Sequence, residues 1–163
     1  MIDHVTLRVH DLAASKAFYA VALAPLGYKL IADYPEAVGY GIDGKPDFWL
    51  TPDPSASPQH VAFAATSRMA VDDFHAAGLA AGGRDNGAPG LRVHYHPNYY
   101  GAFVDDPSGH HLESVIHTPP GGSGKARKAT AKAAAKKAAR KPPARKAARV
   151  KTKARKPARK SRR

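Results

Sequence analysis

The 163-residue chain contains no cysteine, which excludes disulfide bonds, thiolate nucleophiles and cysteine-type zinc sites. No stretch approaches the ~18–20 consecutive apolar residues that a membrane-spanning helix needs. The first residues also lack the basic-then-apolar pattern of a secretion signal. We therefore expect a soluble, cytoplasmic protein.

Acidic and aromatic residues are missing from the C-terminal part of the chain. Residues 121–163 contain 19 Lys and Arg but no Asp, Glu, Phe, Tyr or Trp, whereas residues 1–120 contain 7 basic and 13 acidic residues and all nine histidines. A segment with this composition cannot bury a core and is expected to be disordered by itself. The chain therefore divides into an acidic globular domain (1–118), a flexible linker (119–124) and a basic tail (125–163).

Within the domain, short sequences recur at a constant offset of 56 residues. His4-Val5-Thr6-Leu7 returns as His60-Val61-Ala62-Phe63. Later positions of the first copy match the second at the same offset: Phe18 and Phe74, Leu23 and Leu79, Ala24 and Ala80, Gly27 and Gly83. Matches that keep one offset along such a length indicate a duplicated structural unit. Each copy opens with a histidine, which makes the two histidines candidate metal ligands.

Each copy follows the pattern strand, helix, strand, strand, strand. The first helix begins after Asp11 and is ended by Pro25 and Gly27. The strands expected in the first copy are Ile2–Val9, Tyr28–Tyr34, Ala37–Ile42 and Phe48–Leu50, followed by a linker over Thr51–Pro58. The second copy has a helix over Ala70–Ala81, a loop over Asp85–Gly90, and strands at His60–Ala65, Leu91–His96, Tyr100–Val104 and His111–Ile116. An α+β fold made of two tandem βαβββ units follows.

Paired βαβββ units, a histidine on the first strand of each, and the ending Asp106-Pro107-Ser108-Gly109-His110-His111-Leu112-Glu113 resemble the vicinal oxygen chelate superfamily. That superfamily contains glyoxalase I, bleomycin and fosfomycin resistance proteins, and ring-cleaving extradiol dioxygenases. The resemblance covers residues 1–118 and none of the tail. It implies a glyoxalase-like curved sheet, while the chemistry stays open because one scaffold serves many reactions.

By the same resemblance, the metal ligands would be His4, His60 and Glu113. Two imidazoles and a carboxylate suit Fe, Mn, Ni or Zn as a divalent ion and leave positions open for paired substrate oxygens. Glyoxalase-type sites add a fourth ligand on the last strand of the first unit. Phe48 or Trp49 stands there instead, and neither can coordinate a metal, which favours a three-ligand, dioxygenase-like arrangement. Without a metal, each histidine could simply be a hydrogen-bonded strand residue, and Glu113 could face solvent.

Further candidates gather in the segment His94-Tyr95-His96-Pro97-Asn98-Tyr99-Tyr100. On a strand, His94 and His96 share one face, so either could be the catalytic general acid or base, and Tyr99 or Tyr100 could donate to an oxyanion. Ordinary aromatic packing is the alternative. Trp49 could line the substrate pocket or fill the core. His110 and His111 are expected at the surface.

The basic tail resembles the Lys/Ala/Pro-rich arms of linker histones. Cations without anions or aromatic stacking residues suit non-specific contacts with the phosphates of nucleic acid, and association with the nucleoid would follow. A solubility tail, attraction to anionic membranes, or binding to the acidic domain are the alternatives.

These features predict a divalent-metal-dependent protein of the glyoxalase, bleomycin resistance and dioxygenase group. It would act on a small, vicinally oxygenated substrate by lyase/isomerase or dioxygenase chemistry, as a monomer or a homodimer, and carry a nucleic-acid-binding tail. A metal-free module that binds and sequesters small molecules is the alternative from a different class. A third hypothesis is a passive head on a DNA-compacting arm.

Overall fold

A computed structural model of the protein describes residues 2–119. The tail predicted over 125–163, and all of the predicted linker except Pro119, lie outside this range. Among the described residues, no helix has the length and apolarity needed to cross a membrane.

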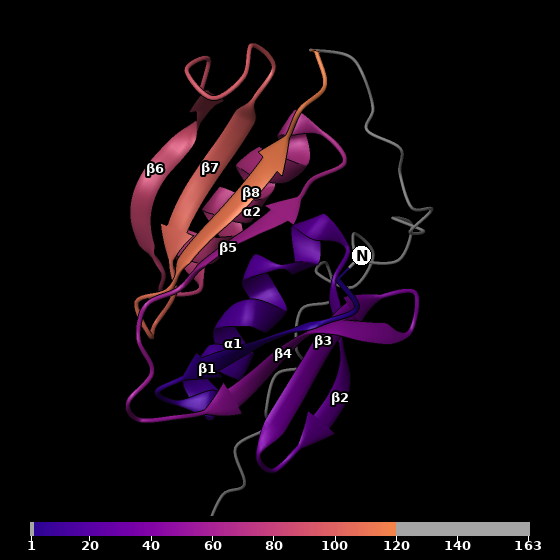
Figure 1. Ribbon diagram of the computed structural model, residues 1–163, viewed down its shortest axis with the longest axis vertical. Coiled ribbons are helices and arrows are strands. Elements are labelled where there is room, and N and C mark those ends of the chain that lie inside the picture. Colours follow the sequence, from indigo (N-terminus) through magenta and orange to yellow (C-terminus); the bar gives the residue numbers. More distant parts are fainter. Residues whose placement is uncertain (1, 120–163) are drawn as a thin grey trace, which may run out of the picture. The chain divides into compact units, whose positions relative to one another are not determined.

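The chain order is the predicted one, twice over. In the first unit, strand β1 (Val5–Val9) precedes helix α1 (Leu12–Ala22) and a short 3-10 turn, η1 (Ala24–Leu26). Strands β2 (Lys29–Tyr34), β3 (Ala37–Ile42) and β4 (Lys45–Pro52) complete it. The second unit consists of β5 (His60–Ala64), α2 (Arg68–Ala80), β6 (Arg84–Leu91), β7 (Tyr100–Asp105) and β8 (His111–Ile116). The predicted α+β fold of tandem βαβββ units is confirmed (Figure 1).

Local sequence signals set the ends of both helices. Asp11 caps α1 by accepting a hydrogen bond from the Ala14 amide at 3.0 Å, and Ser67 caps α2 through the Ala70 amide at 3.0 Å. Gly27 ends the first helical region with a φ of 89°, a conformation that glycine adopts without strain.

Each unit forms its own four-stranded mixed sheet with the same strand order. The orders are β1-β4-β3-β2 and β5-β8-β7-β6, so the first strand of each unit lies at the edge of its sheet and pairs in parallel with the last strand of that unit. Thr6 lies opposite Trp49 in the first sheet, and Ala62 lies opposite Glu113 in the second. Since Thr6 and Ala62 are 56 residues apart, this register makes Trp49 the structural counterpart of Glu113.

One face of each sheet, which we call the inner face, packs against the helices and a shared apolar core. Phe48 on β4 meets Phe63 on β5 with ring centroids 5.1 Å apart, so the inner faces of both units contribute to the same core. The opposite, outer faces are therefore directed away from each other. Residues two apart on a strand share a face, which places Thr6 and Trp49 on the first outer face and Ala62 and Glu113 on the second.

The turn between β7 and β8 holds the two units together. Tyr19 on α1 donates a buried 2.9 Å hydrogen bond to Asp106. His110, only 1% exposed, accepts from the Gln59 amide at 3.0 Å and donates to the Arg8 carbonyl at 2.8 Å. The expectation that His110 lies at the surface is therefore wrong, because both ring nitrogens satisfy buried backbone groups.

Strand β6 differs from the prediction. Composition favoured a loop over Asp85–Gly90 and a strand over Leu91–His96, but the strand covers Arg84–Leu91, and residues 93–95 form a turn. Pairing with β7 stabilises this glycine-rich strand, and the register of the pair shifts at its glycines, between Asp85 and Gly87 and between Gly87 and Gly90. Tertiary pairing has overridden local propensity here.

Candidate functional site

A buried carboxylate dominates the outer face of the second sheet. Glu113 on β8 is 3% exposed, and its Oε2 lies 3.2 Å from Nε2 of His60 on β5. Its Oε1 accepts a hydrogen bond from the Tyr99 hydroxyl. The structure therefore joins three of the predicted site residues, and both carboxylate oxygens have partners, as burial of such a group requires.

The backbone makes room for this group. Glu113 and Gly101 lie on neighbouring strands, and a Cβ at Gly101 would be 3.2 Å from Glu113 Oε1 and 3.3 Å from the Tyr99 ring. The missing side chain therefore lets the Tyr99 ring pass over β7 to reach the carboxylate. Gly101 is a site residue that the sequence did not single out.

Tyr99 is a hydrogen-bond donor at neutral pH. Burial, followed by the hydrogen bond to Glu113, raises the pKa of Tyr99 to about 12. A phenol with this pKa stays protonated and orients the carboxylate rather than removing a proton from a substrate.

His4 does not join this group within one chain. It precedes β1, and its Nδ1 lies 3.0 Å from Asp3 Oδ1. Strand alternation carries it to the first outer face, which is directed away from the face that holds Glu113. Accordingly, residues 2–119 contain no group of three or more His, Asp or Glu side chains arranged to hold a metal ion.

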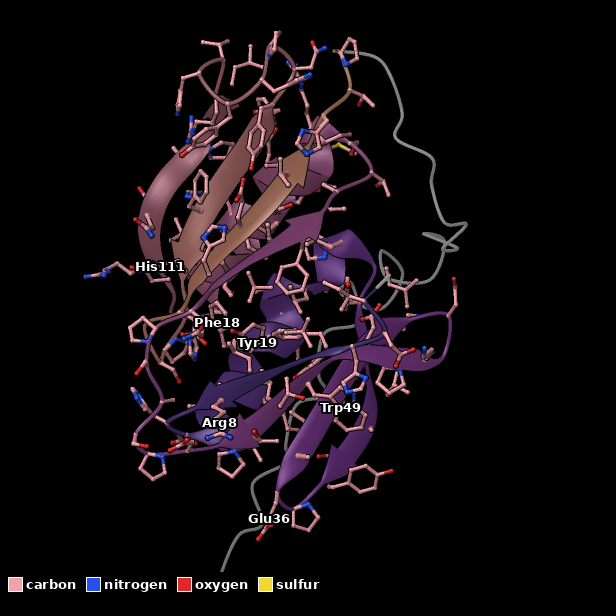
Figure 2. All side chains as sticks on the ribbon, in the orientation of Figure 1. Arg8, Phe18, Tyr19, Glu36, Trp49 and His111 are labelled. Carbon is pink, nitrogen blue, oxygen red and sulfur yellow. The ribbon has the colours of Figure 1, made fainter. Side chains whose placement is uncertain are left out.

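The structure also settles which aromatic residue stands at the place of Glu113 in the first unit. Phe48 is 2% exposed in the core, whereas Trp49 lies on the outer face opposite Thr6. Figure 2 shows Trp49 and Arg8 within the first unit, apart from His111 in the second. The acidic residue of one copy is thus replaced by an aromatic side chain in the other.

The remaining predicted residues take different positions. His94 and His96 are exposed beyond the end of β6, so the expectation that they share a strand face is wrong. His94 contacts Tyr95 with centroids 4.2 Å apart, and Tyr95 contacts Tyr99 at 5.2 Å. The ring centroids of His96 and His117 are 6.1 Å apart, and those of His117 and Tyr99 are 4.9 Å apart. Each histidine therefore connects to Tyr99 through one intervening ring.

Tyr100 lies on the inner face, unlike Tyr99. Its hydroxyl donates to Asp72 on α2 at 2.8 Å, and the Arg68 guanidinium lies 4.7 Å from its ring centroid. Burial and the Asp72 bond raise the pKa of Tyr100. The structure therefore does not bring Tyr100 to the Glu113 group.

Sequence reasoning missed a second buried carboxylate on the same face. Asp105 accepts from Arg84 Nη2 at 2.6 Å, Asn86 at 2.8 Å and His111 Nδ1 at 2.6 Å. Burial alone would raise the pKa of Asp105, but the hydrogen bonds from Arg84 and His111 outweigh it and hold the pKa below its usual value. The sequence contained a signal for His111, the partner of Asp105: it is two residues from Glu113 on one strand, so both side chains must lie on the same face.

The comparisons with known proteins agree with this architecture. The model of the Glyoxalase/Bleomycin resistance protein/Dioxygenase superfamily matches residues 1–114, and the chain belongs to this superfamily. A glyoxalase/bleomycin resistance protein from Albidiferax ferrireducens T118 is 31% identical, with a TM-score of 0.61, over 72% of this chain and 98% of that one. No curated protein matched the chain.

Two further solved structures show how diverse the similar proteins are. A lactoylglutathione lyase from Agrobacterium tumefaciens is 19% identical over 71% of this chain and 92% of its own, with a TM-score of 0.54, which shows the fold alone. The oxidase ChaP-H2 is 26% identical over 76% of this chain and 98% of its own, with a TM-score of 0.51. The scaffold therefore does not by itself select a reaction.

Proposed function

We propose that the protein is a divalent-metal-dependent enzyme that acts on a small compound with two neighbouring oxygens. The supporting observation is the buried Glu113 carboxylate, which faces His60 and is oriented by Tyr99. Lyase/isomerase and ring-cleaving dioxygenase chemistry both suit a substrate of this kind. The proteins to which the chain is similar include a lyase and an oxidase.

The donor set fits a metal once His4 is supplied. His60 and Glu113 provide an imidazole nitrogen and a carboxylate, which suit Fe, Mn, Ni or Zn. A bound ion would act as a Lewis acid on the substrate oxygens. Tyr99 would orient the carboxylate, and His94 or His96 would exchange protons with the substrate from the rim of the same face.

The position of His4 leads us to propose a homodimer. Its outer face cannot meet that of Glu113 within a chain, because the two inner faces share one core. A two-fold arrangement would present His4 of one copy to His60 and Glu113 of the other, and would do so twice. Each complete site would then contain residues from both copies.

Metal analysis of the full chain, purified without chelators, tests this proposal. We expect stoichiometric metal in the wild type and loss of metal in both His60→Ala and His4→Ala. His75→Ala is the matched control, because His75 lies on α2 and pairs with Asp85. If the wild type contained no metal and His4→Ala left the metal content unchanged, the result would support the metal-free binding module instead.

Mixing the two variants tests the shared site. A heterodimer of His4→Ala and His60→Ala chains regains one intact site, so a randomly exchanged mixture should recover about a quarter of the wild-type metal. Recovery of no metal would mean that His4 acts within its own chain, whereas a His4 that takes no part would leave the His4→Ala chains with their metal before mixing.

For the tail we propose non-specific binding to nucleic acid, on the basis of its 19 basic residues and its lack of acidic ones. About 10 phosphate contacts would give a slope near −9 for log affinity against log salt. Removing residues 122–163 should abolish DNA binding in an electrophoretic mobility assay. Retention of DNA binding by the truncated chain would contradict a tail-based mechanism. Loss of DNA binding together with unchanged metal content would leave the domain's activity separate from the tail, whereas a passive head requires that the domain bind no metal.

A further inference from the structure

Two aromatic side chains lie with their rings parallel on the outer face of the first sheet. The rings of Tyr34 on β2 and Trp49 on β4 are parallel to within 5°, with centroids 6.5 Å apart. Tyr34 is 60% exposed, and Trp49 is partly exposed. We call this pair the aromatic platform. Parallel, accessible rings offer a stacking surface for another planar ring.

Gly39 on β3 leaves room for the Trp49 ring of the platform. It lies opposite Trp49 in the sheet, and a Cβ built on it would be 3.1 Å from two carbons of the Trp49 ring. The indole therefore rests directly on the backbone of β3, in space that any other residue would occupy. The intervening strand supports the platform and does not interrupt it.

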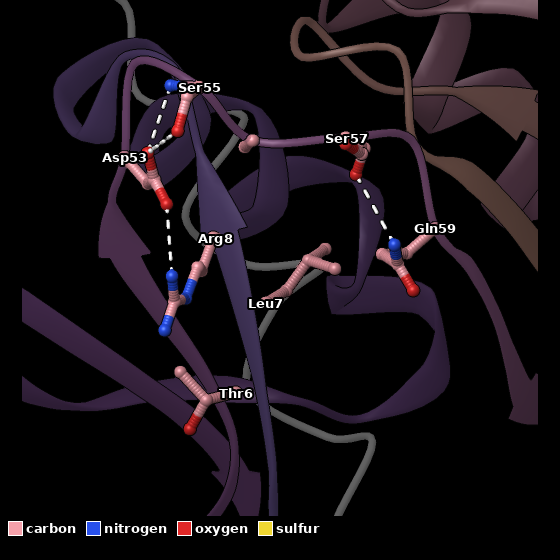
Figure 3. A pocket seen from close by; sticks show the side chains of 8 residues that line it. Thr6, Leu7, Arg8, Asp53, Ser55, Ser57 and Gln59 are labelled. Carbon is pink, nitrogen blue, oxygen red and sulfur yellow. Dashed lines mark hydrogen bonds and ion pairs between the residues drawn. The ribbon is translucent and has the colours of Figure 1, made fainter.

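A polar hollow begins beside the platform. Thr6, the cross-strand partner of Trp49, lines a hollow of ≈ 390 Å³ between β1 and the 53–59 segment (Figure 3). Arg8 and Asp53 form a 3.1 Å ion pair at its wall, and Ser55, Ser57 and Gln59 add polar groups. This volume falls within the range of about 300–1,000 Å³ typical of small-ligand sites.

We propose that the platform and the hollow together bind a planar aromatic compound whose ring stacks on Trp49 and Tyr34 and whose polar substituents enter the hollow. The proposal rests on the proposed function, because it names the substrate class of that site. In the proposed homodimer, the first unit of one copy thus selects the substrate, while the second unit of the other copy holds the reactive centre. A saturated, non-planar compound with the same oxygens would lose the stacking contact.

The single tryptophan gives a direct measurement. In the full chain, Trp49 contributes the only indole N–H signal in a proton–nitrogen correlation spectrum. The probes are catechol and cis-1,2-cyclohexanediol, which carry the same pair of oxygens on a planar and a puckered ring. Metal is first removed with a chelator, so that the signal reports stacking and not coordination. We expect a saturable shift with catechol and none with the diol.

Tyr34→Leu should weaken catechol binding about 3- to 10-fold, the loss expected for one aromatic contact. Tyr95→Leu is the matched control, because Tyr95 is equally exposed, at 63%, but lies in the second unit. Its catechol affinity should stay unchanged. Because Tyr34 is largely exposed, its replacement should leave the fold intact.

Equal shifts with both probes, or no shift with either, would overturn the proposal. An indole signal that changes on dilution but ignores catechol would also overturn it, by showing that a second copy covers the platform. Failure of the metal-dependent function gives a different result, since metal would then be absent while catechol still shifts Trp49.

Discussion

The two βαβββ units share a strand order and a register, but they differ at one matching pair of positions. Opposite Thr6 in the first unit stands Trp49, and opposite the equivalent Ala62 in the second stands Glu113. Glu113 accepts a hydrogen bond from Tyr99 and lies beside His60. Trp49 instead lies parallel to the Tyr34 ring and against Gly39. The two units therefore share a backbone arrangement, while one side chain on each last strand gives the two outer faces a different chemistry.

The largest expected effect comes from replacing the two counterparts. Glu113→Gln keeps the size of the side chain but removes the charge, and should lower affinity for Ni²⁺ or Zn²⁺ by roughly 100-fold or more, since loss of a ligand should exceed the 10- to 100-fold typical of outer-shell losses. Trp49→Leu at the matching position should change metal affinity less than about twofold, because an indole on the outer face coordinates nothing. Titration calorimetry on the metal-free chain measures both. Equal losses in the two variants would mean that the units do not divide the work as proposed.

A smaller effect distinguishes bonds between the units from bonds within one. Tyr19→Phe leaves Asp106 without its partner from α1 and should lower the free energy of unfolding by about 1–3 kcal/mol. Tyr40→Phe removes a bond to the Lys16 carbonyl within the first unit and should cost about 0.5–1.5 kcal/mol. Urea unfolding of both variants gives the difference. If Tyr40→Phe cost more, the inter-unit contact would not be the more important of the two.

The smallest effect concerns the arginine–aspartate pair of each unit and its dependence on pH. The pKa of Asp105 is held below its usual 3.8, so its contribution to stability is present above that pH and is lost as the pH falls through the lower, folded value. Arg84→Ala should lower stability at pH 7 by ~1 kcal/mol and reduce the further loss on acidification. Arg8→Ala, which removes the pair with the more exposed Asp53, should change the urea midpoint very little. Urea unfolding from pH 7 to pH 2 compares them, and matching curves would contradict the different burial of the two carboxylates.

The fold was readable from the sequence because its signals are local and repeated. The 56-residue offset indicates the duplication, Asp11 marks the start of the first helix, and Gly27 marks the end of the first helical region. The structure confirms all three. Strand β6 was not readable, because glycine and proline within it favour a loop until β7 supplies the hydrogen bonds. Only pairing between distant residues could have revealed that strand.

The candidate site was readable only in part, for a similar reason. The resemblance to the superfamily grouped His60 with Glu113, and the structure brings these two side chains together. The sequence could not reveal that α1 and α2 lie on the inner faces of two sheets that share one core. This arrangement separates His4 from His60 and Glu113. Nor could the sequence show that His110 is buried between backbone groups while His111, the next residue, pairs with Asp105.

The turn between β7 and β8 has a consequence for how the domain could be divided. In this turn, Asp106 accepts a hydrogen bond from the Tyr19 hydroxyl. His110 hydrogen-bonds to the Arg8 carbonyl and the Gln59 amide. The strand that follows the turn carries Glu113. The turn that leads into the last strand of the second copy is therefore held by hydrogen bonds to the first copy. Although the chain looks like two interchangeable halves, a half-length ancestor would have needed a partner to complete that turn, and the two copies now depend on each other for it.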